Sequence, residues 1–510
     1  MSNRFISLMI FAPLLGALLQ ALLPQSKTQG GEGASARWIA LGSSLIGSIV
    51  AFALSFGLQG QGPDASIGVS HPWVGSYAIT YDVAIDGLNV LLVLLVALVF
   101  PILIAAEWNQ KVGRRGMQGL LLVLQTAFFG ALCAQDIFVQ FFFWAMSSLP
   151  FYFLIGIWGG PGRERAASHG IAATSLGNAF LFAALVLIYY SVDPHSFSLH
   201  DLAGAKLSGK NLEIGGFELS IAPVAFALVS LGLALRAPVW PFHGWFTEAA
   251  KEAPATVFVA LAGVSAPVAT YIFVKLCYTL FPETLADSAR WIEGFAVINL
   301  LVFGISAVAQ KRLRLLMAFF CLGEIGMILL GVGSLSSAGI VGATYQQMVL
   351  GIGLTGFGLL IGIIEERLGH DSFSDLEGKR VIGGLVTQAP AVSLFGGVLI
   401  ASLLGFPGLG GFVGHSMLVV GSYSVHPAIV LFIGAALLMG VYYLFNMYKL
   451  VFLGTPSQSD GQAGFKDLSH RERLYLVPLA MALLFCGLYP KPLIEVVRPA
   501  VLTILSMVKP

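Results

Sequence analysis

The sequence predicts an all-α integral membrane protein with about fourteen transmembrane helices. Of its 510 residues, 57% are hydrophobic and only 10% are charged, whereas charged residues make up about 25% of a typical soluble domain. The apolar residues also gather into runs of about 20, which is the length that an α-helix needs to cross the roughly 30 Å core of a bilayer. A water-soluble fold could not bury so much apolar surface, so we expect the lipid bilayer to surround the chain.

The expected helices follow the apolar runs in chain order. The first run has no small-residue cleavage site and precedes many further spans, so we interpret it as a helix and not as a signal peptide. The expected spans are residues 4–23, 37–58, 84–106, 117–134, 136–158, 168–191, 218–238, 254–281, 292–310, 313–335, 338–364, 381–404, 427–453 and 474–490.

Basic residues between the spans indicate how the chain crosses the bilayer. Lys and Arg accumulate in cytoplasmic loops, and here the even-numbered loops hold little beyond Lys206, Lys210 and Arg290. This alternation predicts that both termini lie on the side opposite the cytoplasm. The odd-numbered loops hold Lys27, Arg37, Lys111, Arg114, Arg115, Arg163, Arg165, Lys251, Lys311, Arg312, Arg314, Arg367, Lys379, Arg380, Lys466, Arg471 and Arg473.

Net charge, cysteines and motifs exclude several other classes of protein. The net charge is +1, so no basic field exists to attract nucleic acid. The four cysteines lie in apolar segments without the spacing of a zinc or iron–sulfur site, and we expect them to be buried apolar side chains. No phosphate loop, nucleophile elbow or dinucleotide fingerprint occurs in a credible context. We therefore expect no metal, no cofactor and no catalytic residue in this chain.

Two spans contain residues that interrupt a helix. The seventh runs into Pro238 and Pro241, and each proline removes a backbone donor and clashes with the preceding turn. The twelfth runs into a stretch that begins with Gly405 and Pro407 and ends at Gly411. Non-helical backbone at membrane depth needs polar partners, so we expect both breaks to line a polar path. A packing kink is the alternative for each break.

Broken helices at matching places in two five-helix blocks are typical of inverted-repeat transporters. This pattern predicts four parts of the chain. Residues 1–116 hold helices 1 to 3, residues 117–281 the first repeat (helices 4 to 8), residues 292–453 the second repeat (helices 9 to 13), and residues 454–510 a loop and helix 14.

Ionisable residues near the first break are candidates for an ion path, because charges inside a bilayer are costly. Arg236 keeps its proton, so it can anchor a carboxylate or repel a cation; snorkelling to the interface is the alternative. His243 titrates near physiological pH and is the better proton carrier. Glu248, Lys251 and Glu252 follow on a short polar helix, for which a solvated loop is an equal interpretation.

Further candidates lie in later spans and at helix starts. Glu324 stands in the middle of the tenth span and needs a polar partner there. Lys275 lies late in the eighth span, where it can join the path or snorkel to the surface. His415 follows the second break and is either a proton relay or a satisfied core histidine. We expect Asp86 and Asp136, at helix starts, to cap free amide groups.

Several stretches together carry a family resemblance. They are Phe141–Trp144, Leu149–Gly160, Ala237–Trp245, Asp86–Leu88 and Phe406–Gly414. Spread over nearly the whole chain, they resemble subunit M of bacterial respiratory complex I, the NADH-quinone oxidoreductase, and its relatives among the cation/proton antiporters. The resemblance implies the antiporter-like fold with two inverted repeats, in the bacterial inner membrane.

The chain departs from this family at the positions that usually carry protons. In the family, a glutamate and a lysine form a pair whose separation drives proton transfer, and further polar groups form a horizontal axis. An alanine and an arginine cannot exchange a proton, so the route has either moved to His243, Glu324 and His415 or been lost. The replacements are Ala145 for the fifth-helix glutamate, Arg236 for the seventh-helix lysine, Pro267 for the eighth-helix lysine, Gly351 for a histidine expected near Gln347, Glu324 for a tenth-helix histidine and His415 for the glutamate after the second break.

The resemblance implies proton translocation coupled to electron transport to quinone, with no redox chemistry in this chain. It implies partner subunits that hold NADH, FMN, iron–sulfur clusters and quinone, and antiporter-like neighbours on both sides in the membrane. Two alternatives stay open. One is a structural spacer of the same arm, and the other is a subunit of a Na⁺/H⁺ antiporter, a membrane-bound hydrogenase or a carbon-uptake complex.

Overall fold

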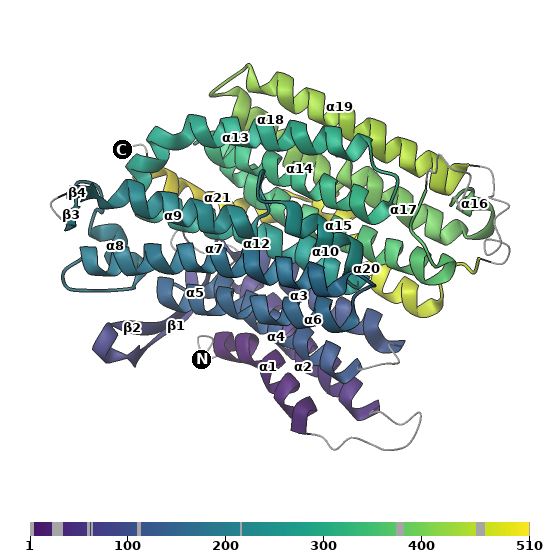
Figure 1. Cartoon of the computed structure of the whole chain (residues 1–510), viewed down its shortest axis with the longest axis horizontal. Coiled ribbons are helices and arrows are strands. Elements are labelled where there is room, and N and C mark those ends of the chain that lie inside the picture. The colour runs from purple at the N-terminus through teal and green to yellow at the C-terminus, as the bar shows by residue number, and fades with distance from the viewer. Residues whose placement is uncertain are drawn as a thin grey trace.

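Long apolar helices form nearly all of the structure and lie roughly side by side (Figure 1). This computed structural model describes residues 5–22, 34–58, 62, 65–109, 114–214, 217–373, 382–454 and 465–508. Lys27, Lys111, Lys379, Arg380 and the first residue of the expected twelfth span lie outside the described residues.

Each of the fourteen expected spans overlaps a helix of the described structure, although some expected spans hold two helices and α18 (Gly410–Tyr423) lies outside all of them. In the described part of the chain, ten helices are long and apolar enough to cross a bilayer, and α20 passes the same test together with α21. Three shorter apolar helices complete the set, namely Val90–Ala106, Ile221–Arg236 and Pro390–Leu403.

The N-terminal part combines three helices with a β-hairpin. The hairpin consists of β1 (Ser66–Val74) and β2 (Ile79–Asp86), which pair antiparallel. The third expected span therefore began too early, because residues 84–86 belong to β2. The Asp86 carboxylate accepts hydrogen bonds from the backbone amides of Leu88 and Asn89 at 2.9 Å, just before the start of α3. The helices of this part are α1 (Phe5–Leu22), α2 (Ala34–Gly57) and α3 (Val90–Ala106).

The next block contains the first broken helix. The Asp136 side chain accepts the amides of Phe138 and Val139 at the start of α5, which confirms its predicted capping role. A kink at Ser147 divides the fifth span into α5 and α6. The elements are α4 (Arg114–Cys133), α5 (Ile137–Met146), α6 (Ser148–Trp158), α7 (Arg163–Ser191), α8 (Leu199–Gly204), β3 (Asn211–Ile214), β4 (Phe217–Ser220), α9 (Ile221–Arg236), α10 (Gly244–Glu252), α11 (Ala255–Val259), a π-helical turn at Ala260–Ser265 and α12 (Ala266–Leu280).

The last block contains the second broken helix. Its first helix begins ten residues earlier than the expected span 292–310, because Pro282 starts it immediately after α12. The elements are α13 (Pro282–Val308), α14 (Leu313–Gly333), α15 (Ser337–Leu368), α16 (Leu385–Gln388), α17 (Pro390–Leu403), α18 (Gly410–Tyr423), α19 (Ile429–Tyr448) with a π-helical turn at Lys449–Leu453, α20 (His470–Leu488) and α21 (Lys491–Val508).

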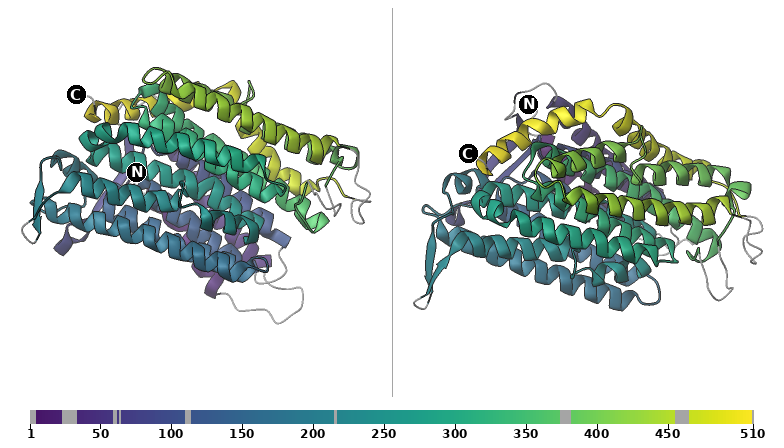
Figure 2. Two further views of the ribbon diagram at one scale, coloured as in Figure 1. Left: turned by 45° about the horizontal axis from the view of Figure 1, so that its top comes forward. Right: turned by 90° about the horizontal axis from the view of Figure 1, so that it is seen from above.

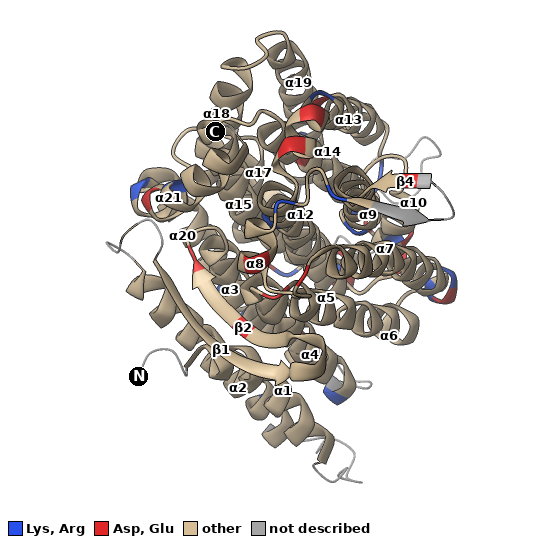
Figure 3. Cartoon of the chain, turned by 90° about the vertical axis from the view of Figure 1, so that its left-hand side faces the viewer, with Lys and Arg blue, Asp and Glu red and all other residues tan. Residues whose placement is uncertain are grey.

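The centre of the bundle is formed by α11, α12 and α15. Most of the segment Ala255–Leu280 and most of Ser337–Leu368 are buried inside the protein, whereas most residues of α19 are not buried. Glycines permit the close approach, because a Cβ added at Gly351 of α15 would collide with the carbonyl oxygen of Gly263. Positions of Lys, Arg, Asp and Glu are few among the described residues when the ribbon is viewed from the side shown in Figure 3.

Helix α21 was not among the expected spans. This helix meets α20 at an angle of 71° (Figure 2). Its buried side chains recur every three or four residues, at Leu493, Val497, Val501, Ile504 and Val508, and polar residues occupy its other face. It is therefore amphipathic along its length and not a continuous apolar run.

Candidate functional site

The first break separates α9, which ends at Arg236, from α10, which begins at Gly244. Pro238 and Pro241 both lie between the two helices. Side chains satisfy the backbone groups that the break releases. The amide of Trp240 donates to Asn299 Oδ1 of α13 at 2.8 Å, and Trp245 Nε1 donates to the carbonyl oxygen of Leu235 at 3.0 Å.

Arg236 turns away from this break toward the kink between α5 and α6. Its guanidinium donates to the hydroxyl oxygens of Ser147 and Ser148 at 2.6 Å each and to the carbonyl oxygen of Trp144 at 3.3 Å. It also stacks over the Trp144 ring, 4.1 Å from the ring centre. No described carboxylate forms an ion pair with it, and Ala145 beside Trp144 offers none. The side chain is 2% exposed, so this charge is held by neutral groups.

His243 and Glu248 do not join Arg236 in one cluster. The His243 ring packs edge-on against Phe303 of α13, with ring centres 4.8 Å apart. Glu248 lies on α10 in a partly exposed group, where its carboxylate is 2.6 Å from His169 Nδ1 and 3.4 Å from Arg165. Its surroundings match the solvated interpretation more closely than a buried path.

The second break separates α17, which ends at Leu403, from α18, which begins at Gly410. Gly405 and Gly408 adopt φ angles of +74° and +90°, a region in which L side chains are strained, and Pro407 lies between them. A Cβ added at Gly405 would come within 2.7 Å of His415 Nδ1. The break therefore packs directly on this histidine.

Glu324 and His415 form the only buried carboxylate–imidazole pair inside the described bundle with both side chains below 10% exposure. Nε2 of His415 lies 3.0 and 3.1 Å from the two carboxylate oxygens. Gln346 of α15 donates to the same carboxylate at 2.8 Å and lies 3.0 Å from His415 Nε2. A carboxyl group and an imidazole at this distance can share one proton.

Three amides that the sequence analysis missed connect this cluster with the rest of the bundle. Gln347, next to Gln346, donates to Thr270 Oγ1 of α12 at 2.8 Å. Asn299, besides accepting from the first break, donates to the carbonyl oxygen of Leu322 at 2.7 Å, two residues before Glu324. The signal was present in the sequence, because Gln346 and Gln347 stand together in an otherwise apolar helix.

Two of the positions where the family carries polar groups are closed to them here. Pro267 lies in the first turn of α12, and Gly351 lies against the backbone of Gly263.

Lys275 lies elsewhere, beneath the β1–β2 hairpin. It is 3% exposed, and its ammonium donates to the carbonyl oxygen of Ala134, just after α4, at 2.6 Å. Asp82 of the hairpin interacts electrostatically with the Lys275 ammonium. Burial raises the pKa of the Asp82 carboxyl, and the positive charge of Lys275 opposes that rise. Lys275 is therefore buried and does not snorkel to the surface.

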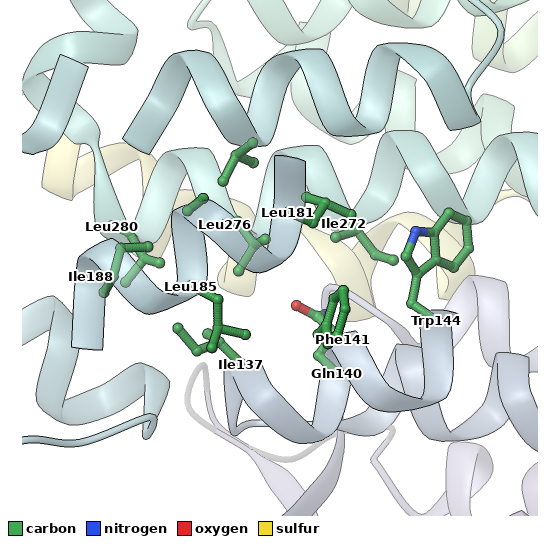
Figure 4. A pocket seen from close by; sticks show the side chains of 12 residues that line it. Ile137, Gln140, Phe141, Trp144, Leu181, Leu185, Ile188, Ile272, Leu276 and Leu280 are labelled. Carbon is green, nitrogen blue, oxygen red and sulfur yellow. The ribbon is translucent and has the colours of Figure 1, made fainter. Parts of the chain in front are cut away.

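An apolar cavity of about 160 Å³ lies between α2, α3, α15, α20 and α21. The cavities near the candidate residues are smaller. An apolar cavity of about 30 Å³ lies between α5, α7, α9 and α12, with Trp144 and Gln140 on its wall (Figure 4). Cavities of about 20 Å³ adjoin Arg236 and Glu324, each large enough for one water molecule, which needs about 10–15 Å³. No group of three His, Cys, Asp or Glu side chains that could hold a metal occurs among the described residues.

The chain is similar to a known family over more than half of its length. The family described as "NADH:quinone oxidoreductase/Mrp antiporter, TM" matches residues 134–440. This range contains both helix breaks and all the ion-path candidates.

Similar proteins extend over nearly the whole chain. NADH-quinone oxidoreductase subunit M of Mycobacterium tuberculosis (strain H37Rv) is 25% identical, over 98% of this chain and 93% of that protein. Subunit M of Rhodobacter capsulatus is also 25% identical, over 98% of this chain and 96% of that protein.

Solved structures share the fold. A chain of respiratory complex I from Thermus thermophilus is 23% identical and superposes with a TM-score of 0.85, covering 99% of this chain and 100% of that chain. A chain of the Mrp complex from Dietzia is 20% identical with a TM-score of 0.82 and covers 99% of both chains.

Proposed function

Because the chain belongs to the NADH:quinone oxidoreductase/Mrp antiporter transmembrane family, we propose that it is an antiporter-like membrane-arm subunit of a complex I-type NADH-quinone oxidoreductase. It translocates protons while other subunits carry out electron transfer to quinone. The nearly full-length similarity to proteins named subunit M supports this assignment over a Na⁺/H⁺ antiporter or hydrogenase subunit.

The buried Glu324–His415–Gln346 cluster carries the proposal. A carboxylate inside a bilayer-embedded bundle is costly unless it is paired or protonated. The imidazole of His415, 3.0 Å away, can pair with the carboxylate of Glu324 as a cation or give it a proton. The adjacent break at Gly405 and Pro407 supplies non-helical backbone, which membrane proteins tolerate where it lines a polar path. We assign proton exchange to this second half of the subunit.

The first half makes no comparable exchange at Arg236. A guanidinium does not give up its proton under physiological conditions, and its partners Ser147, Ser148 and Trp144 are neutral. Arg236 acts here as a fixed charge. Translocation in this copy is therefore weakened or rerouted relative to the family, with His243 at the first break as the remaining titratable group there.

The proposal is tested by the number of protons pumped per electron in the assembled complex reconstituted into vesicles. Glu324→Gln and His415→Ala should each lower this ratio without abolishing electron transfer. The exposed residues Glu283 of α13 and His200 give matched controls, because Glu283→Gln and His200→Ala remove the same groups outside the cluster. An unchanged ratio in both cluster variants would reject the route.

The surroundings of Arg236 favour one second candidate, a spacer that pumps nothing. The double variant Ala145→Glu with Arg236→Lys restores the usual pair of the family. A spacer would pump nothing before or after this change and would be indifferent to Glu324→Gln. A higher ratio in the double variant supports a subunit whose first half is disabled and whose second half works.

The wider assembly follows from the same proposal. Partner subunits hold NADH, FMN, iron–sulfur clusters and quinone, and antiporter-like neighbours flank this chain in the bacterial inner membrane. We propose the fourfold division at 1–116, 117–281, 292–453 and 454–510, which is supported by one break in each five-helix repeat. The distribution of basic residues supports both termini on the non-cytoplasmic side, which an impermeant label on each end of the chain would test.

A further inference from the structure

Among the described residues, Arg236 differs from the buried Arg314 and the partly buried Arg367 in having no acidic partner. Arg314 pairs with Glu365 and Arg367 pairs with Glu472. For Arg236 the described residues offer two hydroxyls, one carbonyl oxygen and an aromatic ring. Removing a charge from water without a counter-charge is strongly unfavourable. The site is therefore electrostatically incomplete.

Hydrogen-bond donors are left over at the same place. A guanidinium has five N–H groups, and Arg236 uses three of them in its bonds to Ser147, Ser148 and Trp144. Its Nε is buried and has no partner among the described residues. The Ser148 oxygen accepts from Arg236 and, at 3.2 Å, from Asn178, so its own proton is free to be donated to a third group.

A cavity adjoins these donors. It has a volume of about 20 Å³ and is lined by Arg236 and Ser148 together with Thr174, Trp245 and Ser265, the remaining wall being mostly apolar. About 10–15 Å³ is enough for one water molecule, so one small ion fits. A phosphate or a carboxylic acid would not.

We infer that this cavity binds a small monovalent anion, chloride or a similar halide, as the counter-ion of Arg236. The anion takes the charge-balancing role that a carboxylate has beside Arg314, and it accepts from the guanidinium and from the Ser148 hydroxyl. The inference does not depend on the proposed proton route, because it concerns the first half of the subunit and a static charge. It explains how a permanent cation is tolerated in the core.

The test compares the thermal stability of the purified assembled complex in sodium bromide, sodium chloride and sodium isethionate at equal ionic strength. Isethionate is too large for the cavity. A ligand that binds only the folded state raises the melting temperature with concentration until the site is saturated, so both halides should raise it. Absence of any halide effect on the wild type would overturn the inference.

Ser148 allows a matched pair of variants. Ser148→Asp places a carboxylate against the guanidinium and should abolish the halide effect, whereas Ser148→Asn has the same size without the charge and should keep it. Persistence of the full effect in Ser148→Asp would contradict the inference. Independently of any variant, crystals of the wild-type complex grown in bromide should show an anomalous peak beside Arg236 and Ser148, and its absence would contradict the site. Neither result bears on the proton ratios of Glu324 and His415 variants.

Discussion

Gln346 and Gln347, neighbours on α15, point in different directions and bind different halves of the molecule. Gln346 donates to Glu324 at 2.8 Å, and Gln347 donates to Thr270 of α12 at 2.8 Å. Successive residues of an α-helix are about 100° apart, so one helix can serve two partners in this way. The polar groups of both halves thus meet at α15, in the buried centre of the bundle.

Replacing Gln346 tests the coupling within the cluster. Gln346→Met removes a donor to the Glu324 carboxylate while nearly keeping the side-chain volume, so we expect fewer protons pumped per electron. Gln347→Met breaks only the link to Thr270 and should lower the free energy of unfolding by about 1 kcal/mol, with a smaller effect on pumping. Proton ratios measured side by side in vesicles check this order, and equal ratios for both variants would contradict it.

Asn299 holds the first break against α14. Asn299→Ala leaves the amide of Trp240 and the carbonyl of Leu322 without this partner, and an unsatisfied buried group costs about 1–3 kcal/mol. We therefore expect a lower melting temperature of the complex. Asp287→Ala, at an exposed position of the same helix, serves as control, and a melting temperature equal to that control would refute the role of Asn299.

A substitution at Gly351 tests whether close packing excludes a side chain from this position, where the resemblance implied a histidine. A Cβ at this position would strike the backbone of Gly263 and approach Leu95 Cδ2 to 2.6 Å, and such overpacking costs about 1–3 kcal/mol. Gly351→Ala should therefore destabilise the protein. At Gly323 of α14 nothing lies within 4 Å of an added Cβ, so Gly323→Ala should be neutral or stabilise by about 0.5–1 kcal/mol. Unfolding of the two variants under the same conditions decides the point.

Lys275 is predicted to anchor α12 and not to carry protons. Its ammonium donates to the carbonyl oxygen of Ala134, close to the C-terminal end of α4, where a cation is favoured by the helix dipole. Lys275→Met should lower the free energy of unfolding by about 1–3 kcal/mol and leave the proton ratio unchanged. Lys251→Met, at an exposed position, is the control. A lower proton ratio for Lys275→Met alone would place it in the path.

The order of the spans could be predicted from the sequence because it depends on local properties. Apolar runs of sufficient length mark the helices, and Pro238 and Pro407 mark the breaks, since proline and glycine act on the backbone where they stand. The start of α3 was misplaced because the end of strand β2, at residues 83–85, is apolar and the helix begins only three residues after the strand. Helix α21 was not predicted because Lys491, Glu495 and Arg498 interrupt the apolar run along the sequence.

The site was less accessible from sequence because partners come from distant segments. Glu324 and His415 were both candidates, yet only packing of α14 against α18 brings them to 3.0 Å. The replacement of the usual glutamate by Ala145 was visible, but the compensation by Ser147 and Ser148 was not, because serine is common in helices. Glu248 and Lys275 were candidates besides Glu324, each with an alternative interpretation, and their burial and partners in the structure separate the three.

The central claim is that Glu324 changes its protonation state while the complex works. Infrared difference spectroscopy of the assembled complex, oxidised against NADH-reduced, detects the carbonyl stretch of a carboxyl group that gains or loses a proton. The account predicts a carboxyl band that disappears in Glu324→Gln and shifts in His415→Ala, because the imidazole contacts that carboxyl. A spectrum that is identical in wild type and Glu324→Gln would contradict it.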